Sequence, residues 1–447
     1  MVIAEENSTP TAVLDYVFGG TSIPPNSANN SLQGLQSFSD EPPPQDDTPP
    51  AAAPTQSAKQ PFTKTTGPLT ISSIGLKYLD KKLQLTLDAT IKAAGVEVKL
   101  KGFGLRFPME SASAFVKDPS QIELLLDALG ISAVRLPLTI AGIMQRIPMG
   151  YAGGIVVEFE PYTFLAMGSY MKITQQKALD NGQIQINSFK SILVMLSVAG
   201  PIAELEFGSL DGLTGGYGHN SQMRLPSIDE VTSHPFLATS QIAAPGANGD
   251  MLATMASLTT GKRPWFSPRN GPIWVAAGVT AGLFQMLDVD AVLAVDISSD
   301  VKIAIFADCQ AAIPADVPDA ERFAFVEMGL LMVLDYAKGA LYCQGQLTPK
   351  SYIMDKNCHL TGGFAFCYWF EGSGHEGDWV FSVGGYHSQH TPPAWYPKPP
   401  RVAIDWKYDG TISIHGEAYF AITPKVSRGI LYCSAYYLLP AMYSRRS

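Results

Sequence analysis

The chain is short of charge, and of positive charge in particular. Only 16% of its 447 residues are charged, whereas 46% are hydrophobic; in soluble domains about a quarter is usually charged. Such a chain can bury a large core and still leave apolar surface for a partner to cover. Lys and Arg number 31 against 40 Asp and Glu, which gives a net charge of -9. Because nucleic-acid binding needs a basic face, this balance argues against a nucleic-acid partner.

Cysteine pairs, an export signal and long apolar runs are also missing. The five cysteines lack CxxC spacing; they are Cys309, Cys343, Cys358, Cys367 and Cys433. An odd, sparse set fits reduced thiols better than a disulfide framework. The first residues show no basic stretch followed by an apolar segment, so they do not resemble a signal peptide. The longest mostly apolar run, residues 273–287, is shorter than the about 20 residues of a spanning helix. We therefore expect a cytoplasmic protein without a transmembrane segment.

What is present is a strand pattern that starts at residue 67. In the segment 83–89, Leu83, Leu85 and Leu87 alternate with Gln84 and Thr86. Successive side chains on a strand point to opposite faces, so this alternation predicts a sheet with one buried face. Similar segments recur through most of the chain. They predict a mainly β fold with a large antiparallel sheet that curls or forms two layers.

Local signals predict hairpins, a central strand and a short helix within this fold. The pairs Asn181-Gly182 and Asp409-Gly410 are typical of two-residue hairpin turns. The segment 191–198, SILVMLSV, is apolar on both faces, as a central strand is. Between Asp118, a good N-cap, and Gly130, a helix stop, leucines recur at helical spacing. We therefore expect one or two short helices beside the sheet.

Composition divides the chain into four parts. Residues 1–66 are acidic and rich in proline, which predicts a disordered tail. Residues 67–225 form an N-terminal β lobe, residues 226–270 an irregular connector, and residues 271–447 a C-terminal β lobe. The two lobes could also form one continuous β domain.

The glycine-rich segment 212–221, GLTGGYGHNS, is the nearest approach to a nucleotide-binding motif. It lacks the Lys-Ser/Thr of a phosphate loop, and no helix follows as in a dinucleotide-binding unit. We interpret it as a tight turn whose glycines take positive φ, with Tyr217 packed over the end of the sheet. No GxSxG elbow is present, and we assign no catalytic residue and no cofactor.

The segment 374–400 gathers the best candidates for chemistry. His387 and His390 form an HxxH pair, and His375 and Glu376 lie just upstream. A structural zinc site needs four ligands, usually as two close pairs, and the fixed-spacing zinc motifs are missing. These four residues are therefore candidates for a metal or acid–base site, against the alternative of ordinary loop histidines. Neighbouring aromatics could stack sugars or lipids, although large aromatics on strands are more often core.

Several longer stretches carry a family resemblance. They are RLPLTIAGI (135–143), YAGGIVVEFEPYTFLAMGSY (151–170), DGLTGGYGHNSQMRLP (211–226), CHLTGGFAFCYWF (358–370) and, within 384–424, GGYH, PPRVAIDW and GEAYFAITP. In order and spacing they resemble a fungal and bacterial family of large β-rich proteins known only as a domain of unknown function. The resemblance implies a β-rich body over residues 67–424 and no particular activity. Members of that family continue further, so the chain resembles an N-terminal part that is truncated at its C-terminus.

Two functions from different classes remain. The first is a non-enzymatic structural or binding module whose apolar sheet face takes a protein partner or a lipid-like ligand. The alternative is a carbohydrate-binding or hydrolytic protein with its site in the 374–400 loop cluster. The alternative requires His375, Glu376, His387 and His390 to converge on one cleft.

Overall fold

The computed structural model describes residues 2–6, 9–13, 59–79, 82–108, 122–178, 184–237, 251–298, 301–315, 317–408, 412–424 and 427–437. Strands make up 68% of the structure and helices 6%. The recorded strand pairings are antiparallel, which confirms the predicted mainly β, antiparallel fold. None of the helices in the described part of the chain is long and apolar enough to cross a membrane.

The chain forms two compact units. Unit 1 comprises Met1–Glu160, Leu165–Tyr170 and Asn248–Ala256, and unit 2 comprises Pro161–Phe164, Met171–Ala247 and Ser257–Ser447. The strand β11 (Tyr162–Ala178) and the helix α3 (Met251–Thr259) contribute residues to both units. The predicted division into lobes around residues 226–270 stays a prediction.

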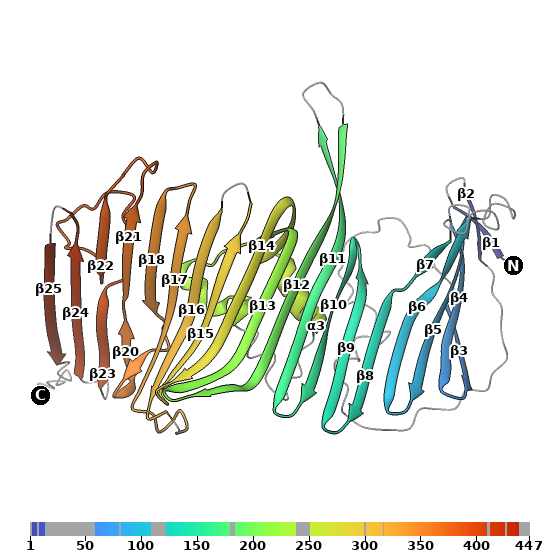
Figure 1. Ribbon diagram of the computed structural model, residues 1–447, viewed down its shortest axis with the longest axis horizontal. Helices are drawn as coiled ribbons and strands as arrows, with labels where there is room; N and C mark the ends of the chain where they lie inside the picture. Colours follow the sequence, from blue (N-terminus) through green and yellow to red (C-terminus); the bar gives the residue numbers. More distant parts are fainter. Residues whose placement is uncertain are drawn as a thin grey trace, which may run out of the picture. The chain divides into compact units, whose positions relative to one another are not determined.

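Unit 1 is an antiparallel meander (Figure 1). Its first two strands pair with each other, β3 to β6 pair in sequence, β6 also pairs with β7 and β8, and β8 to β10 pair in sequence. The strands are β1 (Val2–Glu6), β2 (Thr9–Val13), β3 (Lys59–Thr66), β4 (Leu69–Leu79), β5 (Lys82–Ala93), β6 (Val96–Pro108), β7 (Glu123–Leu125), β8 (Ala128–Arg135), β9 (Leu138–Ile147) and β10 (Gly150–Phe159). Of the predicted tail, residues 1–66, the structure describes β1, β2 and β3; the remainder lies outside the described residues.

The predicted helix over residues 118–129 is wrong where the structure describes it. Residues from 122 onward form β7 and β8, and Gly130 lies within β8 rather than at a helix end. Leu125 pairs with Gly104 and Leu129 with Leu100, both on β6. The backbone bonds to β6 therefore outweigh the helical spacing of the leucines, because tertiary pairing overrides a weak local propensity.

The expectation of one buried face on β5 also fails. Leu85 is 44% exposed, and its partner across the ladder, Leu105, is also exposed. Asp88 instead marks a bulge: its carboxylate accepts hydrogen bonds from Ser73 Oγ at 2.6 Å and from the Gly102 amide at 2.7 Å. The bulge shifts the register of both neighbouring ladders, so strict alternation cannot continue along the strand.

Unit 2 begins with long strands and ends with shorter ones (Figure 1). They are β12 (Ile184–Leu205), β13 (Gly208–Met223), β14 (Phe266–Leu283), β15 (Leu287–Asp296), β16 (Lys302–Ile313), β17 (Ala324–Asp335), β18 (Ala340–Leu347), β19 (Tyr352–Ile353), β20 (Asp355–Thr361), β21 (Gly363–Trp369), β22 (Trp379–Val383), β23 (Val402–Tyr408), β24 (Ile412–Ile422) and β25 (Ser427–Tyr437). Strands β12 to β18 pair in sequence, followed by β21, β22, β24 and β25, while β19, β20 and β23 form a branch between β17 and β24. The predicted Asn181-Gly182 and Asp409-Gly410 turns lie outside the described residues.

The face of β13–β18 that carries Trp274 and Phe306, here called the inner face, is covered by the segment 224–237, with Trp265 packed against His234 of that segment. This segment includes the 3-10 helix η3 (Ile228–Ser233). The His234 ring packs 4.4 Å from the Phe306 ring, and Phe236 lies edge-on to Trp274 at 5.9 Å. His234, Phe306 and Trp274 are fully buried. Residues 228–237, which belong to the predicted connector, therefore cover an aromatic core.

The glycine-rich segment 212–221 is not a turn, as the sequence suggested, but lies inside β13. A Cβ on Gly216 would meet Phe236 at 2.2 Å, and one on Gly218 would meet Trp274 at 2.2 Å. These glycines therefore make room for the two rings to approach the strand. Tyr217 points to the opposite side and is exposed.

Candidate functional site

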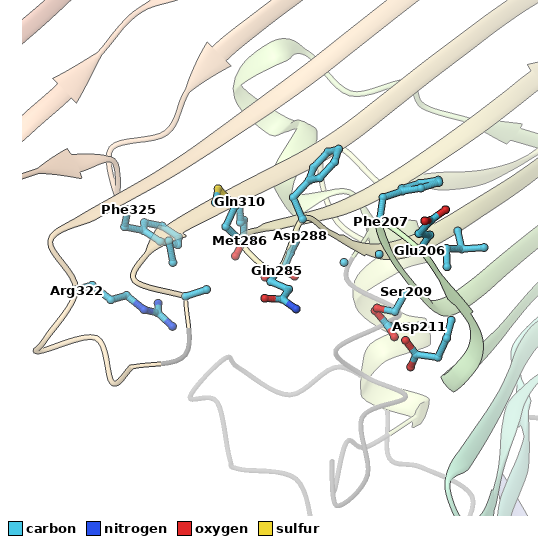
Figure 2. Close-up of a pocket in the computed structure, with 17 residues that line it drawn as sticks. Glu206, Phe207, Ser209, Asp211, Gln285, Met286, Asp288, Gln310, Arg322 and Phe325 are labelled. Atoms are coloured by element: carbon cyan, nitrogen blue, oxygen red, sulfur yellow. The ribbon is translucent and has the colours of Figure 1, made fainter.

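A cavity of about 890 Å³ opens on the inner face where β12–β16 end. Its polar wall comes from the start of β13, the β14–β15 turn and the facing positions of β15 and β16 (Figure 2). Ser209 and Asp211 lie on one side, Arg322 and Phe325 on the other, and Gln285, Asp288 and Gln310 lie between them (Figure 2). These residues are far apart in the chain, and only the register of the backbone pairing from β13 to β17 brings them together.

Gly282 on β14 forms the floor between the two aspartates. A Cβ added to Gly282 would lie 3.1 Å from Ser209 Oγ, 3.5 Å from Asp211 Oδ2 and 3.8 Å from Asp288 Oδ1. Ser209 Oγ also donates to Asp211 Oδ2 at 2.7 Å. The glycine thus leaves a space that three oxygen atoms surround, and an ordinary side chain would occupy it.

The aspartates beside the cavity are harder to ionise than usual. Burial raises the pKa of Asp288, the Asp211 carboxylate raises it further, and Arg322 opposes both effects. Burial likewise raises the pKa of Asp290, against the hydrogen bond that Thr280 donates to it at 2.5 Å. A carboxyl group that is buried and has another negative charge nearby keeps its proton to a higher pH, so its pKa rises.

Asp308 is the most perturbed of these acids. It is 7% exposed, and burial raises its pKa to about 6, with the Glu327 and Asp290 charges adding to the rise. Gln310 Nε2, from the cavity wall, donates to Asp308 Oδ2 at 2.9 Å, while Asp308 Oδ1 is buried without a hydrogen-bond partner.

Glu327 is the next acid along the inner face and is fully engaged. Lys350 Nζ lies 2.8 Å from one carboxylate oxygen, and the Thr348 hydroxyl donates to the other. Both carboxylate oxygens of Glu327 therefore have side-chain partners, whereas one oxygen of Asp308 has none.

The opposite, outer face of β14–β17 has the reverse character. In the paired segments of these four strands, every charged residue lies on the inner face; they are Asp288, Asp290, Asp296, Lys302, Asp308, Glu327 and Asp335. The outer-face positions are all apolar or cysteine; they are Val275, Ala277, Val279, Ala281, Leu283, Leu287, Val289, Ala291, Leu293, Val295, Ile303, Ile305, Ala307, Cys309, Ala311, Ile313, Ala324, Val326, Met328, Leu330, Met332 and Leu334. Leu293 is 44% exposed, and Val275, Val279 and Ile305 are exposed as well.

The outer face continues into an apolar hollow of about 410 Å³ over β17, β18, β21 and β22. Its lining consists of Met328, Leu347, Gly362, Gly363, Phe364, Phe381, Val383 and Val402. No residue of this lining carries a polar side chain. The hollow can therefore take hydrocarbon but offers no side chain that would orient a polar group.

The structure places the four candidate residues of the 374–400 cluster against different neighbours. The His375 ring stacks on Trp395 at 3.9 Å, and Glu376 accepts backbone hydrogen bonds from Gly372 and Gly374. The His387 ring lies against Tyr419, and His390 lies near Tyr386. The described residues include no group of three or more His, Cys, Asp or Glu that could hold a metal ion. A joint site at these four residues stays a prediction.

The loop between β22 and β23 is held together by its own aromatics. Asp378 accepts a hydrogen bond from the Tyr396 hydroxyl at 2.8 Å, and the Tyr386 hydroxyl donates to the Pro397 carbonyl at 2.9 Å. Tyr386 and Tyr396 belong to a buried cluster that also contains Trp369. At the base of the loop, Arg401 donates to the carbonyls of Gly384 and Tyr386. This loop packs against the inner face as a second cover.

The comparison with known families agrees with this architecture. Residues 62–430 match a family described as a family of unknown function, DUF6603. The chain belongs to this family. No curated protein and no solved structure matches it. DUF6603 membership thus supports the resemblance stated from the sequence and assigns no activity to the cavity or to the outer face.

The sequence alone did not indicate the cavity. Its residues come from the ends of separate strands, and none forms a motif with its neighbours in the chain. One signal was present: in LDVDAVLAVD (287–296), aspartates at alternate positions predict a polar stripe on one face of a strand. The cavity appears only when this stripe is aligned with Ser209, Asp211 and Gln310.

Proposed function

We propose that this DUF6603 chain is a non-enzymatic binding module whose outer face packs against an apolar protein face. The observation that supports this is the segregation in the paired rows of β14–β17, where every charged residue lies on the inner face and the outer-face positions are apolar or cysteine. Contiguous exposed apolar surface of this kind usually marks an interaction site.

The dimensions of the outer face favour a protein partner over a single lipid. Neighbouring strands lie about 4.8 Å apart, so four strands present a flat surface on the order of 15–20 Å across, and a second sheet or helix layer covers such a surface. The face has no cationic side chains in its paired rows, and the chain is acidic overall. Both features disfavour an anionic membrane as the occupant.

We propose specifically that two copies of the chain pack with their outer faces against each other. A uniformly apolar face is complementary to its own image, as a two-fold interface requires. Sedimentation velocity should show concentration-dependent dimerisation of the full chain. The double variant Leu293→Glu with Ile305→Glu, which places charge on two directly paired outer positions, should weaken the dimer by at least about tenfold.

The matched control is Gln389→Glu with Asn357→Glu, two exposed positions away from the outer face. It adds the same charge and should leave dimerisation unchanged. A wild-type chain that stays monomeric, or a double variant that dimerises like the wild type, would contradict the proposal. Co-sedimentation of monomeric chain with neutral phospholipid vesicles would assign the face to lipid instead.

The apolar hollow supports a second candidate, a lipid-like ligand. Its lining of Phe364, Phe381 and neighbouring aliphatic side chains accepts hydrocarbon alone. Native mass spectrometry of the purified chain should then show one bound lipid, which the variant Phe381→Glu should release. An unliganded spectrum for chain that has been incubated with a long-chain fatty acid would count against this candidate.

The carbohydrate-binding or hydrolytic alternative at residues 374–400 has one supporting observation. Trp395 is 43% exposed, with one neighbouring ring, that of His375, stacked on it. An exposed indole can stack on a sugar ring. If this alternative holds, Trp395→Ala should abolish binding of soluble glucan or chitin oligosaccharides in calorimetry, and His387→Ala should weaken it.

We also propose a cytoplasmic location, which rests on the sequence. The four cysteines that the structure describes, Cys309, Cys343, Cys358 and Cys367, are free thiols. Burial raises the pKa of Cys367, which keeps that thiol protonated and unreactive. Fractionation of the native source would test this location directly.

A further inference from the structure

We propose that the cavity at the ends of β12–β16 binds an organic cation, an alkylammonium group that enters between Asp211 and Asp288 above Gly282. This inference is independent of the outer-face proposal, because it concerns the opposite face of the sheet. The alkylammonium could belong to a free amine or to a lysine side chain of a peptide.

The geometry above Gly282 suits an ammonium group. Three oxygens from β13 and β15 surround the space that the missing side chain leaves, at 3.1, 3.5 and 3.8 Å from the position of the absent Cβ. An ammonium group has three N–H donors and no acceptor. The nitrogen would lie beyond the position of the absent Cβ, in contact with the Gly282 Cα, where these oxygens can accept its N–H groups, whereas a neutral hydroxyl donates only once.

The charge of the lining selects the same class of ligand. Four carboxylate side chains line the cavity, those of Glu204, Glu206, Asp211 and Asp288, against the single cation of Arg322. Arg322 is already paired with Asp319 at 2.5 Å. The negative charge of the cavity is therefore unbalanced within the described chain, and a cation would relieve the repulsion between Asp211 and Asp288.

Aromatic rings at the mouth add a second element of recognition. Phe207 and Phe284 lie with their ring centroids 6.4 Å apart, and Phe284 is 64% exposed. Aromatic faces attract organic cations through the ring quadrupole and also cover the hydrocarbon next to the charge. A volume of about 890 Å³ lies in the range of small-molecule sites.

An incompletely satisfied carboxylate adjoins the same wall. Asp308 is almost fully buried, is bonded to the lining residue Gln310, and has one oxygen without a hydrogen-bond partner. Asp308 does not itself line the cavity, and its contact with the wall is the hydrogen bond from Gln310.

Isothermal titration of the full chain with 1,5-diaminopentane tests the proposal. The diamine should bind, and the neutral isostere 1,5-pentanediol should not. A lysine-containing pentapeptide, compared with its norleucine counterpart, distinguishes a peptide source from a free amine. Asp288→Asn should weaken diamine binding by about tenfold, because a charge-assisted hydrogen bond is lost.

Gly282→Ala tests the geometry without a change of charge. Its methyl group would occupy the space between the three oxygens, so we expect binding to fall by at least the same factor. The matched control is Gly215→Ala on β13, where an added Cβ has only a backbone oxygen at 3.9 Å. This control should bind like the wild type, and circular dichroism should show that both variants fold.

Three results would overturn the proposal. The first is no binding of the diamine at millimolar concentration, and the second is equal binding of the diol. The third is unchanged affinity in both Asp288→Asn and Gly282→Ala while the folds are intact. Tighter binding of a glucan oligosaccharide than of any amine would reassign the cavity to carbohydrate.

Discussion

Ile305 and Phe306 are neighbours on β16, yet they belong to two different kinds of surface. Phe306 is fully buried under His234 on the inner face, whereas Ile305 is exposed on the outer face. Charge follows the same division, since the acids of β14–β17 all point inward. In an ordinary half-buried sheet the apolar face is covered and the polar face meets water. On β14–β17 the apolar outer face is instead the exposed one, which is the observation behind the proposed interface.

The largest difference in unfolding free energy is expected between alanine variants of these two neighbours. Phe306→Ala removes a ring from a packed aromatic core and should cost about 3–5 kcal/mol of unfolding free energy. Ile305→Ala should cost about 1 kcal/mol, because its side chain is already partly in water. Urea denaturation of both variants at low protein concentration measures the difference. Equal costs would mean that the outer face is already covered in the single chain.

The adjacent glycines of β13 should sharpen the same comparison. Gly216→Ala forces a methyl group against Phe236 on the inner face and should cost about 1–3 kcal/mol through overpacking. Gly215→Ala faces the open outer side and should be neutral or stabilising by about 0.4–1 kcal/mol. Thermal melts of the two variants should therefore shift in opposite directions, and a common direction would contradict the assignment of faces.

The buried His234 should make the inner face sensitive to acid. Burial, with a smaller contribution from the Arg224 charge, lowers the pKa of His234 to about 3, below its usual 6.5. Between these values the unfolded chain binds the proton and the folded chain does not, so stability falls as the pH drops from 6.5 towards 3, by up to about 1.4 kcal/mol per pH unit. In the variant His234→Phe, this part of the stability–pH slope should disappear.

Asp308 should change the stability in the opposite direction over part of this pH range. Its pKa is raised from 3.8 to about 6, so the folded chain binds the extra proton and stability falls as the pH rises from 3.8 to 6. In the variant Asp308→Asn, the acid-side slope from His234 should therefore become steeper between pH 4 and 6. A slope that stays the same as in the wild type would show that Asp308 ionises normally.

The smallest effect is expected at the exposed His415. The Asp405 hydrogen bond at 2.5 Å, followed by that of Glu417 at 3.0 Å, raises the pKa of His415. The protonated His415 stabilises the folded chain through these two carboxylates. This stabilisation is fully present below pH 6.5 and is lost as the pH rises through the raised pKa of the folded state. Because the ring is about one third exposed, the effect should be small. An NMR titration of the His415 ring that gives an ordinary pKa would contradict it.

The sequence was sufficient for the fold class because alternation over long segments has only one regular explanation. The strand 191–198 was expected to be central because it is apolar on both faces; in β12, Leu193 and Met195 are buried, but Leu196 on the other face is 52% exposed. Two local interpretations failed for one reason. The leucines near residue 125 and the glycines near residue 216 carry helix and turn signals, but their roles depend on partners in other strands.

The candidate site was not predictable in the same way. Gly282, Asp211 and Asp288 are close only because the ladders from β13 to β15 hold a particular register. A bulge between Leu210 and Gly212 on β13 adjusts that register by one residue beside the cavity, and a sequence pattern does not reveal such a bulge. The histidine-rich loop attracted attention because its residues are close in sequence, which is a weaker guide than closeness across strands.

The base of the loop at residues 384–400 has an evolutionary consequence. Arg401 closes it by binding the carbonyls of Gly384 and Tyr386, so the loop begins and ends at one fixed point. The exposed residues Ser388 and Gln389 lie between this point and the buried Tyr396. Changes of length at these two positions can therefore be absorbed without a shift in the register of β22 or β23 against their partner strands.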